Sequence, residues 1–437
     1  HVFYSELYNY QKRITNKPVP KWTELSMEYK ELSRLYHMDA SVERDSISRK
    51  LAEERRRMPS TFDLAFETPA GRLFVAMPRE MIVLYELILR AERKASALMH
   101  SLPPIARFAL VRGLVLEEVV STNAIEQIQS TRQQVADALD ASQGANLEAK
   151  RFKEIALLYL GLDEPEGSLP ETPEDIRAIY DRVMAGELSE GQYPDGELFR
   201  KGGVNITAGG VRVVHHGLEP EARIREAMEF MLALVRRPDV PEIISALASH
   251  YVFEYAHPFY DGNGRTGRYL LALFLREPLS MATVLSLSRA IAENRKLYYD
   301  AFSTVENPLN RGELTFFVYN MLELVRIGQS TVLETLETSL SRFEEVSAKA
   351  KEMAIEEGLT AQERNVVSAL VQFDLFGALP SASLDDVASC MGLGKQMARK
   401  HVAKLEERGL VKKTRNHPLA FALSESVRER TGLRALA

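Results

Sequence analysis

The stretch HPFYDGNGRTGR, residues 257–268, constrains the fold of this chain more than any other part of its sequence. Its GNGRTG core fits the GxGxxG pattern of dinucleotide-binding loops, which must leave a buried strand and enter a helix. The preceding residues 242–256, EIISALASHYVFEYA, instead repeat apolar side chains at helical spacing. We therefore exclude a dinucleotide-binding fold and expect a helix, a short loop and a second helix.

Two other ligand-binding loops fail on spacing. A P-loop needs a lysine in the GxxxxGK register, and none follows these glycines. A calcium loop counted from Asp261 needs an acid at its twelfth position, where Ala272 stands.

The loop nevertheless collects groups that suit phosphate chemistry. His257 precedes a proline, which disfavours helical backbone, so we expect it where the first helix ends. The apolar Phe259 can hold the loop against the core and leave Asp261 free to face a metal ion. Gly262 and Gly264 lack a Cβ atom, so backbone N–H groups can approach an anion closely.

The second helix adds positive charge at the same place. It begins near Thr266, and its N-terminus carries the positive end of the helix dipole. Arg265 and Arg268 contribute two guanidinium groups. A base, a carboxylate, backbone amides and two cations within one short stretch predict a phosphate-binding reaction site.

The rest of the chain predicts a mainly α fold with several domains. Apolar residues recur at helical spacing, residues 1–75 read as largely helical, and the middle of the chain contains one hairpin signal, around 208–210. The 437 residues suffice for two or three cores. We divide them into an N-terminal helical region, a second helical region, a central core, a helical linker and a C-terminal unit, at 1–75, 76–168, 169–330, 331–360 and 361–437.

Composition excludes several classes of protein. The single cysteine, Cys390, rules out an internal disulfide framework and fits a reducing cytosol. The longest strongly apolar run, Tyr269–Leu275, is far too short to cross a bilayer. The net charge of -6 argues against a chain that coats nucleic acid along its whole length. We expect a soluble cytoplasmic protein without a membrane partner.

The motif resembles the signature of Fic-domain proteins, HPFx(D/E)GNGRxxR, at every fixed position. The resemblance extends from about Leu169 to Arg326 and implies a Fic-type helical core with a β-hairpin flap. It also implies transfer of AMP from ATP, with Mg²⁺, to a tyrosine, serine or threonine hydroxyl of a target protein. The implied roles are general base for His257, Mg²⁺ ligand for Asp261, anion hole for Gly262, Asn263 and Gly264, and outer-phosphate binding for Arg265 and Arg268.

Two further parts of the site follow from the resemblance. The hairpin 204–214 would be the flap that pairs with an extended target segment, through Val204, Ile206 and Val211, unless it is only a surface hairpin. Tyr299, one of two adjacent tyrosines, would flank the adenine, although packing in the core is an equal alternative.

Residues 122–127, TNAIEQ, resemble the family's inhibitory pattern (S/T)xxxE(G/N). The resemblance places Glu126 against Arg268, where a carboxylate would occupy the guanidinium and misplace the γ-phosphate of ATP. Gln127 departs from the pattern, and an ordinary solvated glutamate is the alternative. In some relatives this glutamate assists removal of AMP from the target, so de-AMPylation stays open.

The C-terminal unit, 361–437, has twelve Lys/Arg and eight Asp/Glu, a net charge of +4 that leaves about -10 for the rest. A capped helix at 383–391, a turn, a helix at 395–408 and strands at 409–411 and 421–423 around a basic stretch resemble a winged helix-turn-helix. The candidate DNA-binding side chains are Lys395, Arg399, Lys400 and Lys404. Winged helices also bind proteins, and a basic helix face is often only solvated.

The sequence therefore favours a protein adenylyltransferase (AMPylase) restrained by Glu126. The alternatives are a DNA-binding regulator whose Fic core senses nucleotide, and transfer of another nucleotide such as UMP. Residues 1–75 carry no functional signal, and the sequence leaves open the identity of the target and a homodimer.

Overall fold

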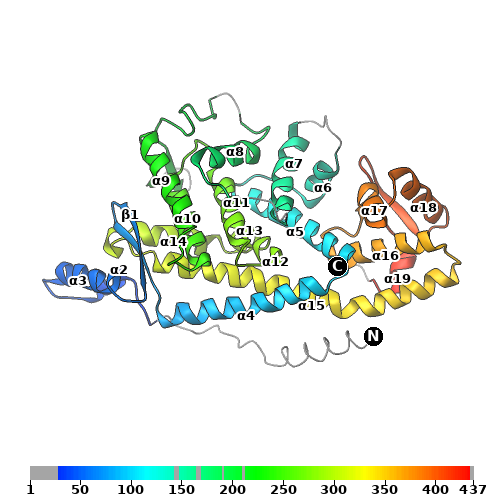
Figure 1. The fold of residues 1–437 in the computed structure, drawn as a ribbon, viewed down its shortest axis with the longest axis horizontal. Coiled ribbons are helices and arrows are strands. Elements are labelled where there is room, and N and C mark those ends of the chain that lie inside the picture. Colours follow the sequence, from blue (N-terminus) through cyan, green and yellow to red (C-terminus); the bar gives the residue numbers. More distant parts are fainter. Residues whose placement is uncertain (1–27, 142–146, 164–168, 189–190, 209–211, 434–437) are drawn as a thin grey trace.

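The computed structural model describes residues 28–141, 147–163, 169–188, 191–208 and 212–433. Within these ranges the protein is mainly α, with three small antiparallel sheets of strand order β1-β2, β3-β4 and β5-β7-β6 (Figure 1). The predicted mainly α class is confirmed. No helix in the described ranges has both the length and the apolar character needed to cross a bilayer.

The N-terminal region corrects one expectation. It contains α2 (Leu32–Met38), α3 (Arg44–Arg56) and a hairpin of β1 (Thr61–Thr68) and β2 (Gly71–Ala76). The hairpin lies at the boundary of a region predicted to be largely helical. Its alternation is hard to see in the sequence because the register shifts between Asp63 and Glu67, where Ala65 has a φ of 59°.

Long helices support the rest of the molecule. α4 (Arg79–Ser101) packs along α15 (Thr315–Glu356), which runs unbroken through the segment expected as a separate linker helix (Figure 1). The chain between α4 and α15 forms the central core, described below, and several further helices. These are α5 (Pro104–Ile125), α6 (Arg132–Asp140), α7 (Leu147–Leu160), the 3-10 turn η1 (Gly161–Asp163), α12 (Met281–Val284), α13 (Leu287–Glu293), α14 (Arg295–Glu306) and the 3-10 turn η2 (Pro308–Asn310).

The central core surrounds two buried helices. α10 (Glu242–Ala256) and α11 (Asn263–Leu275) pack against each other with almost every side chain buried, which confirms the predicted order of helix, loop and helix. α11 begins at Asn263, three residues before the expected start near Thr266, because Gly262 serves as its N-cap. α9 (Glu221–Leu234) packs on α10, and α8 (Pro173–Val183) begins at the predicted cap, Thr172. β3 (Asn205–Ala208) and β4 (Arg212–His216) form the predicted hairpin.

The C-terminal unit has the element order expected of a winged helix-turn-helix. Its elements are α16 (Ala361–Phe376), β5 (Ala382–Ser383), α17 (Leu384–Met391), α18 (Lys395–Glu407), β6 (Val411–Asn416), β7 (Leu419–Leu423) and α19 (Glu425–Thr431). The basic stretch 412–415, expected between two strands, lies inside β6 instead. β6 is an edge strand with outward charged side chains, a composition that sequence patterns of apolar alternation do not detect.

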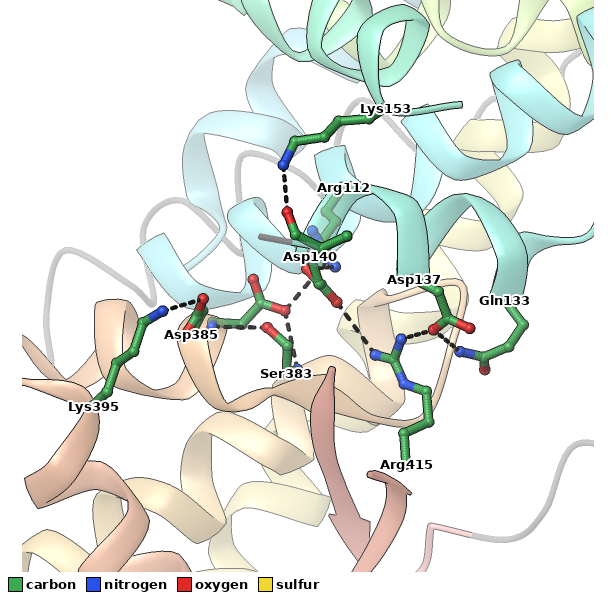
Figure 2. A network of polar contacts seen from close by, with 11 residues as sticks. Arg112, Gln133, Asp137, Asp140, Lys153, Ser383, Asp385, Lys395 and Arg415 are labelled. Carbon is green, nitrogen blue, oxygen red and sulfur yellow. Dashed lines mark hydrogen bonds and ion pairs between the residues drawn. The ribbon is translucent and has the colours of Figure 1, made fainter. Parts of the chain in front are cut away.

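The C-terminal unit docks on α5 and α6 through an ion network (Figure 2). Arg415 of β6 pairs with Asp137 and with Asp140, whose carboxylate lies 3.3 Å from the guanidinium. Arg112 of α5 contacts Asp140 at 2.6 Å and Asp386 of α17 at 3.5 Å. Strand β6 and helix α17 of the C-terminal unit are therefore bound to α5 and α6, which precede the central core.

Candidate active site

The loop between α10 and α11, residues 257–262, is held tightly in shape. His257 caps α10 in the left-handed region, at φ 50° and ψ 62°, and its N–H donates to the carbonyl of Phe253 at 2.9 Å. Phe259 is fully buried and stacks on Tyr180 with ring centroids 3.6 Å apart, so the predicted apolar anchor is confirmed. The loop is thus fixed at both its first residue and its middle.

The start of α11 has the features of an anion site. Gly262 is the N-cap at φ 79°, and the first N–H groups of any helix lack acceptors within that helix. Asn263 is buried, and its side chain accepts from the Phe259 N–H at 2.9 Å and donates to the Phe259 carbonyl at 2.8 Å. That side chain closes the loop, which leaves the backbone N–H as the part of Asn263 that can face a phosphate.

Burial lowers the pKa of His257 to about 4, and the charge of Arg200 acts in the same direction. The carbonyl of Glu254 accepts a hydrogen bond from the ring and opposes the shift. The imidazole is therefore neutral at pH 7, with one nitrogen donating to a carbonyl and the other able to take a proton. That is the state a general base requires.

The predicted pair of Glu126 and Arg268 is present. Arg268 is buried and donates to the Glu126 carboxylate at 2.7 Å, to the Thr122 hydroxyl at 2.8 Å and to the Thr122 carbonyl at 3.2 Å. Burial raises the pKa of Glu126, but the charge and hydrogen bond of Arg268, together with the charge of Arg265, outweigh burial, and the net pKa is lowered. A Cβ atom on Gly264 would lie 2.1 Å from this carboxylate, so only glycine leaves room for it.

The Glu126 carboxylate marks the centre of the site. It lies against Gly264 at the start of α11, is bound by Arg268, and is close enough to His257 for their charges to interact. An internal anion thus occupies the place where the sequence predicts that a phosphate binds.

Gln127 explains why the inhibitory pattern calls for glycine or asparagine. α5 ends at Ile125, and Gln127 turns the chain with a φ of 61°. Glycine and asparagine tolerate this left-handed backbone better than glutamine does. Gln127 adopts it despite its side chain, so the departure from the pattern does not displace Glu126.

Arg265 binds a different carboxylate from Arg268. Its guanidinium is buried and contacts Glu187 at 2.5 Å and the Met184 sulfur at 2.9 Å. Arg151 shares the same Glu187 carboxylate at 2.9 Å. The outer-phosphate role of Arg265 stays a prediction, and it would require this arginine to leave Glu187.

Asp261 is exposed and directly precedes Gly262, the N-cap of α11. Its carboxylate accepts from the Gly262 N–H at 2.7 Å and from the Gln192 amide at 3.2 Å. Among the described residues no group of three His, Cys, Asp or Glu side chains forms a preformed metal site. A single accessible carboxylate suits Mg²⁺ that is held mainly by substrate phosphates.

The predicted flap and adenine residues have different surroundings. Val204 and Ile206 are half-buried along β3, while Val211 lies outside the described residues. Tyr299 keeps 50% of its surface exposed, whereas its neighbour Tyr298 is buried and bonds His250 at 2.8 Å. Of the two tyrosines, Tyr299 is therefore the one accessible to a ligand.

Sequence reasoning missed two residues that shape the site, Arg200 and Glu187. Arg200 is fully buried and bonds the carbonyl of His257 at 2.8 Å. Both residues lie between α8 and the hairpin, in segments without a recognisable motif. No sequence signal in this chain distinguishes them from surface charges.

A neutral imidazole, a helix N-terminus and a buried arginine near one carboxylate make an arrangement that can bind a phosphate group. Residues 170–275 match the family model described as Fic/DOC family, so this segment of the chain is a Fic/DOC-type domain. Members of that family generally transfer nucleotide-type groups to proteins.

The chain is also similar to three solved structures. A Fic family protein from Desulfovibrio desulfuricans G20 is 20% identical over 83% of this chain and 98% of that chain, with a TM-score of 0.48. Fic-1 from C. elegans is 19% identical over 60% and 75%, with a TM-score of 0.40. A Fic domain containing signaling protein from Bacteroides thetaiotaomicron VPI-5482 is 16% identical over 58% and 97%, with a TM-score of 0.39.

Proposed function

We propose that this Fic domain transfers AMP from ATP to a tyrosine, serine or threonine hydroxyl of a target protein. One observation carries the proposal: the Glu126 carboxylate lies against Gly264 at the N-terminus of α11, bound by Arg268, and the loop that carries His257 leads directly into this helix. A site that stabilises an anion there, beside a neutral base, can bind a phosphate in the same place.

The chemical step uses the groups around that anion. His257 accepts the proton of the target hydroxyl as its oxygen attacks the α-phosphorus, and the bond to the β-phosphate breaks to release pyrophosphate. Backbone N–H groups of Gly262, Asn263 and Gly264 stabilise the charge on the α-phosphate. Asp261 would hold Mg²⁺, which would supply positive charge to the leaving phosphates when bound.

Glu126 acts as the brake in this scheme. Arg268 would bind the γ-phosphate, but Glu126 already occupies its guanidinium. The Glu126 side chain is 35% exposed and that of Arg268 only 3%, so the glutamate is the partner that can swing out. A released Glu126 could also orient a water molecule toward AMP on the target, so de-AMPylation belongs to the same proposal.

The remaining roles concern binding. The β3–β4 hairpin would receive an extended target segment by strand addition, through Val204, Ile206 and Val211. Tyr299 would flank the nucleobase, because its exposed ring lies close enough to Glu126 for the Glu126 charge to act on it. Arg265 would join the outer phosphates after leaving Glu187.

Incubation with labelled ATP and Mg²⁺ tests the proposal. We expect weak self-labelling of the unmodified chain, stronger labelling of Glu126→Gly and none of His257→Ala. Labelled UTP in parallel decides which nucleotide is used, and loss of label from a pre-modified chain reports de-AMPylation. If none of the three chains is labelled by either nucleotide, the transferase proposal fails.

A DNA-binding regulator is the second candidate, supported by the exposed basic side chains of α18. Arg399 and Lys400 are exposed, whereas Lys395 pairs with Asp385 at 2.8 Å and Lys404 lies 3.9 Å from Glu363. Phosphate contacts from such a helix would weaken steeply with salt. Fluorescence anisotropy with duplex DNA should therefore show salt-dependent binding that Arg399→Glu reduces. Binding without any labelling would favour this candidate.

A further inference from the structure

Arg200 is the most completely buried charged side chain near the site. It lies between α8 and β3 with none of its surface exposed. Every hydrogen bond recorded for its guanidinium in the described ranges goes to a backbone carbonyl. These acceptors are His257 at 2.8 Å, Gly202 at 2.6 Å, Leu218 at 2.9 Å and Ala256 at 3.2 Å.

The four carbonyls belong to two structures that the reaction must bring together. Ala256 and His257 form the end of α10 and the start of the loop that carries the base. Gly202 and Leu218 flank the two ends of the β3–β4 hairpin. The guanidinium therefore connects both ends of the hairpin to the backbone of the base.

Only arginine can make this connection. Its planar guanidinium presents five donors at fixed angles, whereas a lysine ammonium is a compact point charge on a flexible stem. A buried carbonyl left without a donor is costly, so these contacts cannot be dropped without a local rearrangement. The backbone N–H of Arg200 also donates to the Pro258 carbonyl at 3.2 Å, which adds a further contact with the loop.

The space around Arg200 is closely packed against the base. A Cβ atom on Gly217 would lie 2.3 Å from the Arg200 guanidinium and 3.1 Å from the His257 Cβ. His257 also has a left-handed backbone, which costs a non-glycine residue about 1 kcal/mol. The bond from Arg200 to the His257 carbonyl helps to hold that conformation.

We propose that Arg200 is a positioning residue: it sets the β3–β4 hairpin in register with His257, so that a hydroxyl on a target strand added to the hairpin arrives at the imidazole. This inference rests on the proposed transfer function. Arg200 has no recorded contact with residues 261–268, where the nucleotide would bind. Its loss should therefore impair transfer without impairing nucleotide affinity.

The test uses the full chain carrying Glu126→Gly, labelled ATP and Mg²⁺. Arg200→Lys and Gly217→Ala should each slow self-labelling at saturating ATP by ~10- to 100-fold, the loss typical of a misplaced reacting group. The ATP concentration for half-maximal labelling should change by less than about two-fold. Arg236→Lys is the matched control, because Arg236 also bonds only backbone carbonyls, those of Leu232 and Pro170.

Two measurements separate positioning from a general loss of stability. The NMR pKa of the His257 imidazole should rise in Arg200→Met, because the Arg200 charge lowers that pKa in the unmodified chain. Amide hydrogen exchange should increase in peptides covering 201–208, 212–218 and 256–258 in Arg200→Lys and in Gly217→Ala. Neither change should appear in Arg236→Lys.

Each result decides one of the two proposals. If Arg200→Lys labels and exchanges like Arg236→Lys, the positioning role is wrong while the transferase proposal stands. If the Glu126→Gly parent is never labelled, the transferase proposal fails. The exchange data then still decide whether Arg200 holds the hairpin and the loop together, and unchanged exchange would overturn that role.

Discussion

Two arginine–carboxylate contacts hold α5, one in its N-terminal half and one just past its C-terminal end, and they behave differently. In the N-terminal half, Arg112 joins the network of Asp140 and Asp386 that binds the C-terminal unit (Figure 2). Just past its end, Glu126 contacts Arg268. Burial raises the pKa of Asp140 to about 6 despite Arg112, and the nearby Asp386 charge raises it further, whereas the pKa of Glu126 is lowered.

The difference comes from how many carboxylates compete for each arginine. Asp140 shares its surroundings with other aspartates, while Glu126 faces Arg268, Arg265 and His257. The contact at the site therefore stays ionised at neutral pH, and under the proposed function a competing phosphate would displace it. The network at the other end responds to pH. One helix thus carries a ligand-sensitive contact and a proton-sensitive contact.

Arg112→Met should produce the largest effect, at the interface end. It removes the cation that the buried carboxylates of Asp140 and Asp386 share and leaves Asp140 with Arg415 alone. Breaking a buried pair typically costs ~3–5 kcal/mol, and the remaining Arg415 contact places the expected loss at the lower end. Urea unfolding at pH 7.5 measures the loss. Arg132→Met is the matched control on the neighbouring surface, since Arg132 is half exposed in its pair with Glu117. Equal losses in the two variants would contradict a special role for the network.

The next effect concerns the pH dependence of stability. The folded-state pKa of Asp140, about 6, lies above the ordinary value of 3.8, so the folded protein holds this proton more tightly than the unfolded chain. The resulting stability is present below pH 4 and is lost as pH rises toward 6, a change of roughly 3 kcal/mol. Asp140→Asn removes it. The difference in unfolding free energy between the two chains should therefore change between pH 4 and 6, and a constant difference would count against the raised pKa.

At the other end of α5, Glu126→Gln should release the brake in part. The amide keeps the shape of the side chain but loses a charge-assisted hydrogen bond worth ~1.5–3 kcal/mol, so labelling should rise by ~10- to 100-fold. The initial rate of self-labelling measures this. Glu117→Gln, on the same helix, should leave the rate unchanged, and an increase there would show that any change in α5 activates the protein.

Gln127→Gly should give the smallest effect. Gln127 has a φ of 61°, and glycine relieves left-handed strain of about 1 kcal/mol. We expect a slightly more stable chain with an unchanged or stronger brake, measured by thermal unfolding and by the labelling rate. A destabilised variant would mean that the Gln127 side chain, rather than its backbone, supports the turn.

Much of the site could be predicted because its residues are adjacent in sequence. The helix ending at His257, the Phe259 anchor and the glycine at the start of α11 all follow from local backbone rules. The hairpin and the Glu126 contact were also predicted. The partner of the Arg265 guanidinium could not be predicted, because it is Glu187, which belongs to a segment far away in the sequence.

Other features had no local signal. The register shift in the β1–β2 hairpin interrupts the apolar alternation by which strands are predicted from sequence, and the basic strand β6 lacks such alternation altogether. The network of Arg415 with Asp137 and Asp140 joins residues far apart in the chain, each of which reads alone as an ordinary surface charge.

The sequence by itself determined the chemistry of the loop, because a proline, three glycines and an apolar anchor restrict the backbone whatever surrounds them. Only the tertiary structure decided which charges meet. It brought Arg265 to Glu187 and Arg200 to four backbone carbonyls. The physical reason is that a buried guanidinium takes whichever acceptors the packed elements bring to it, and those acceptors lie far away in the chain.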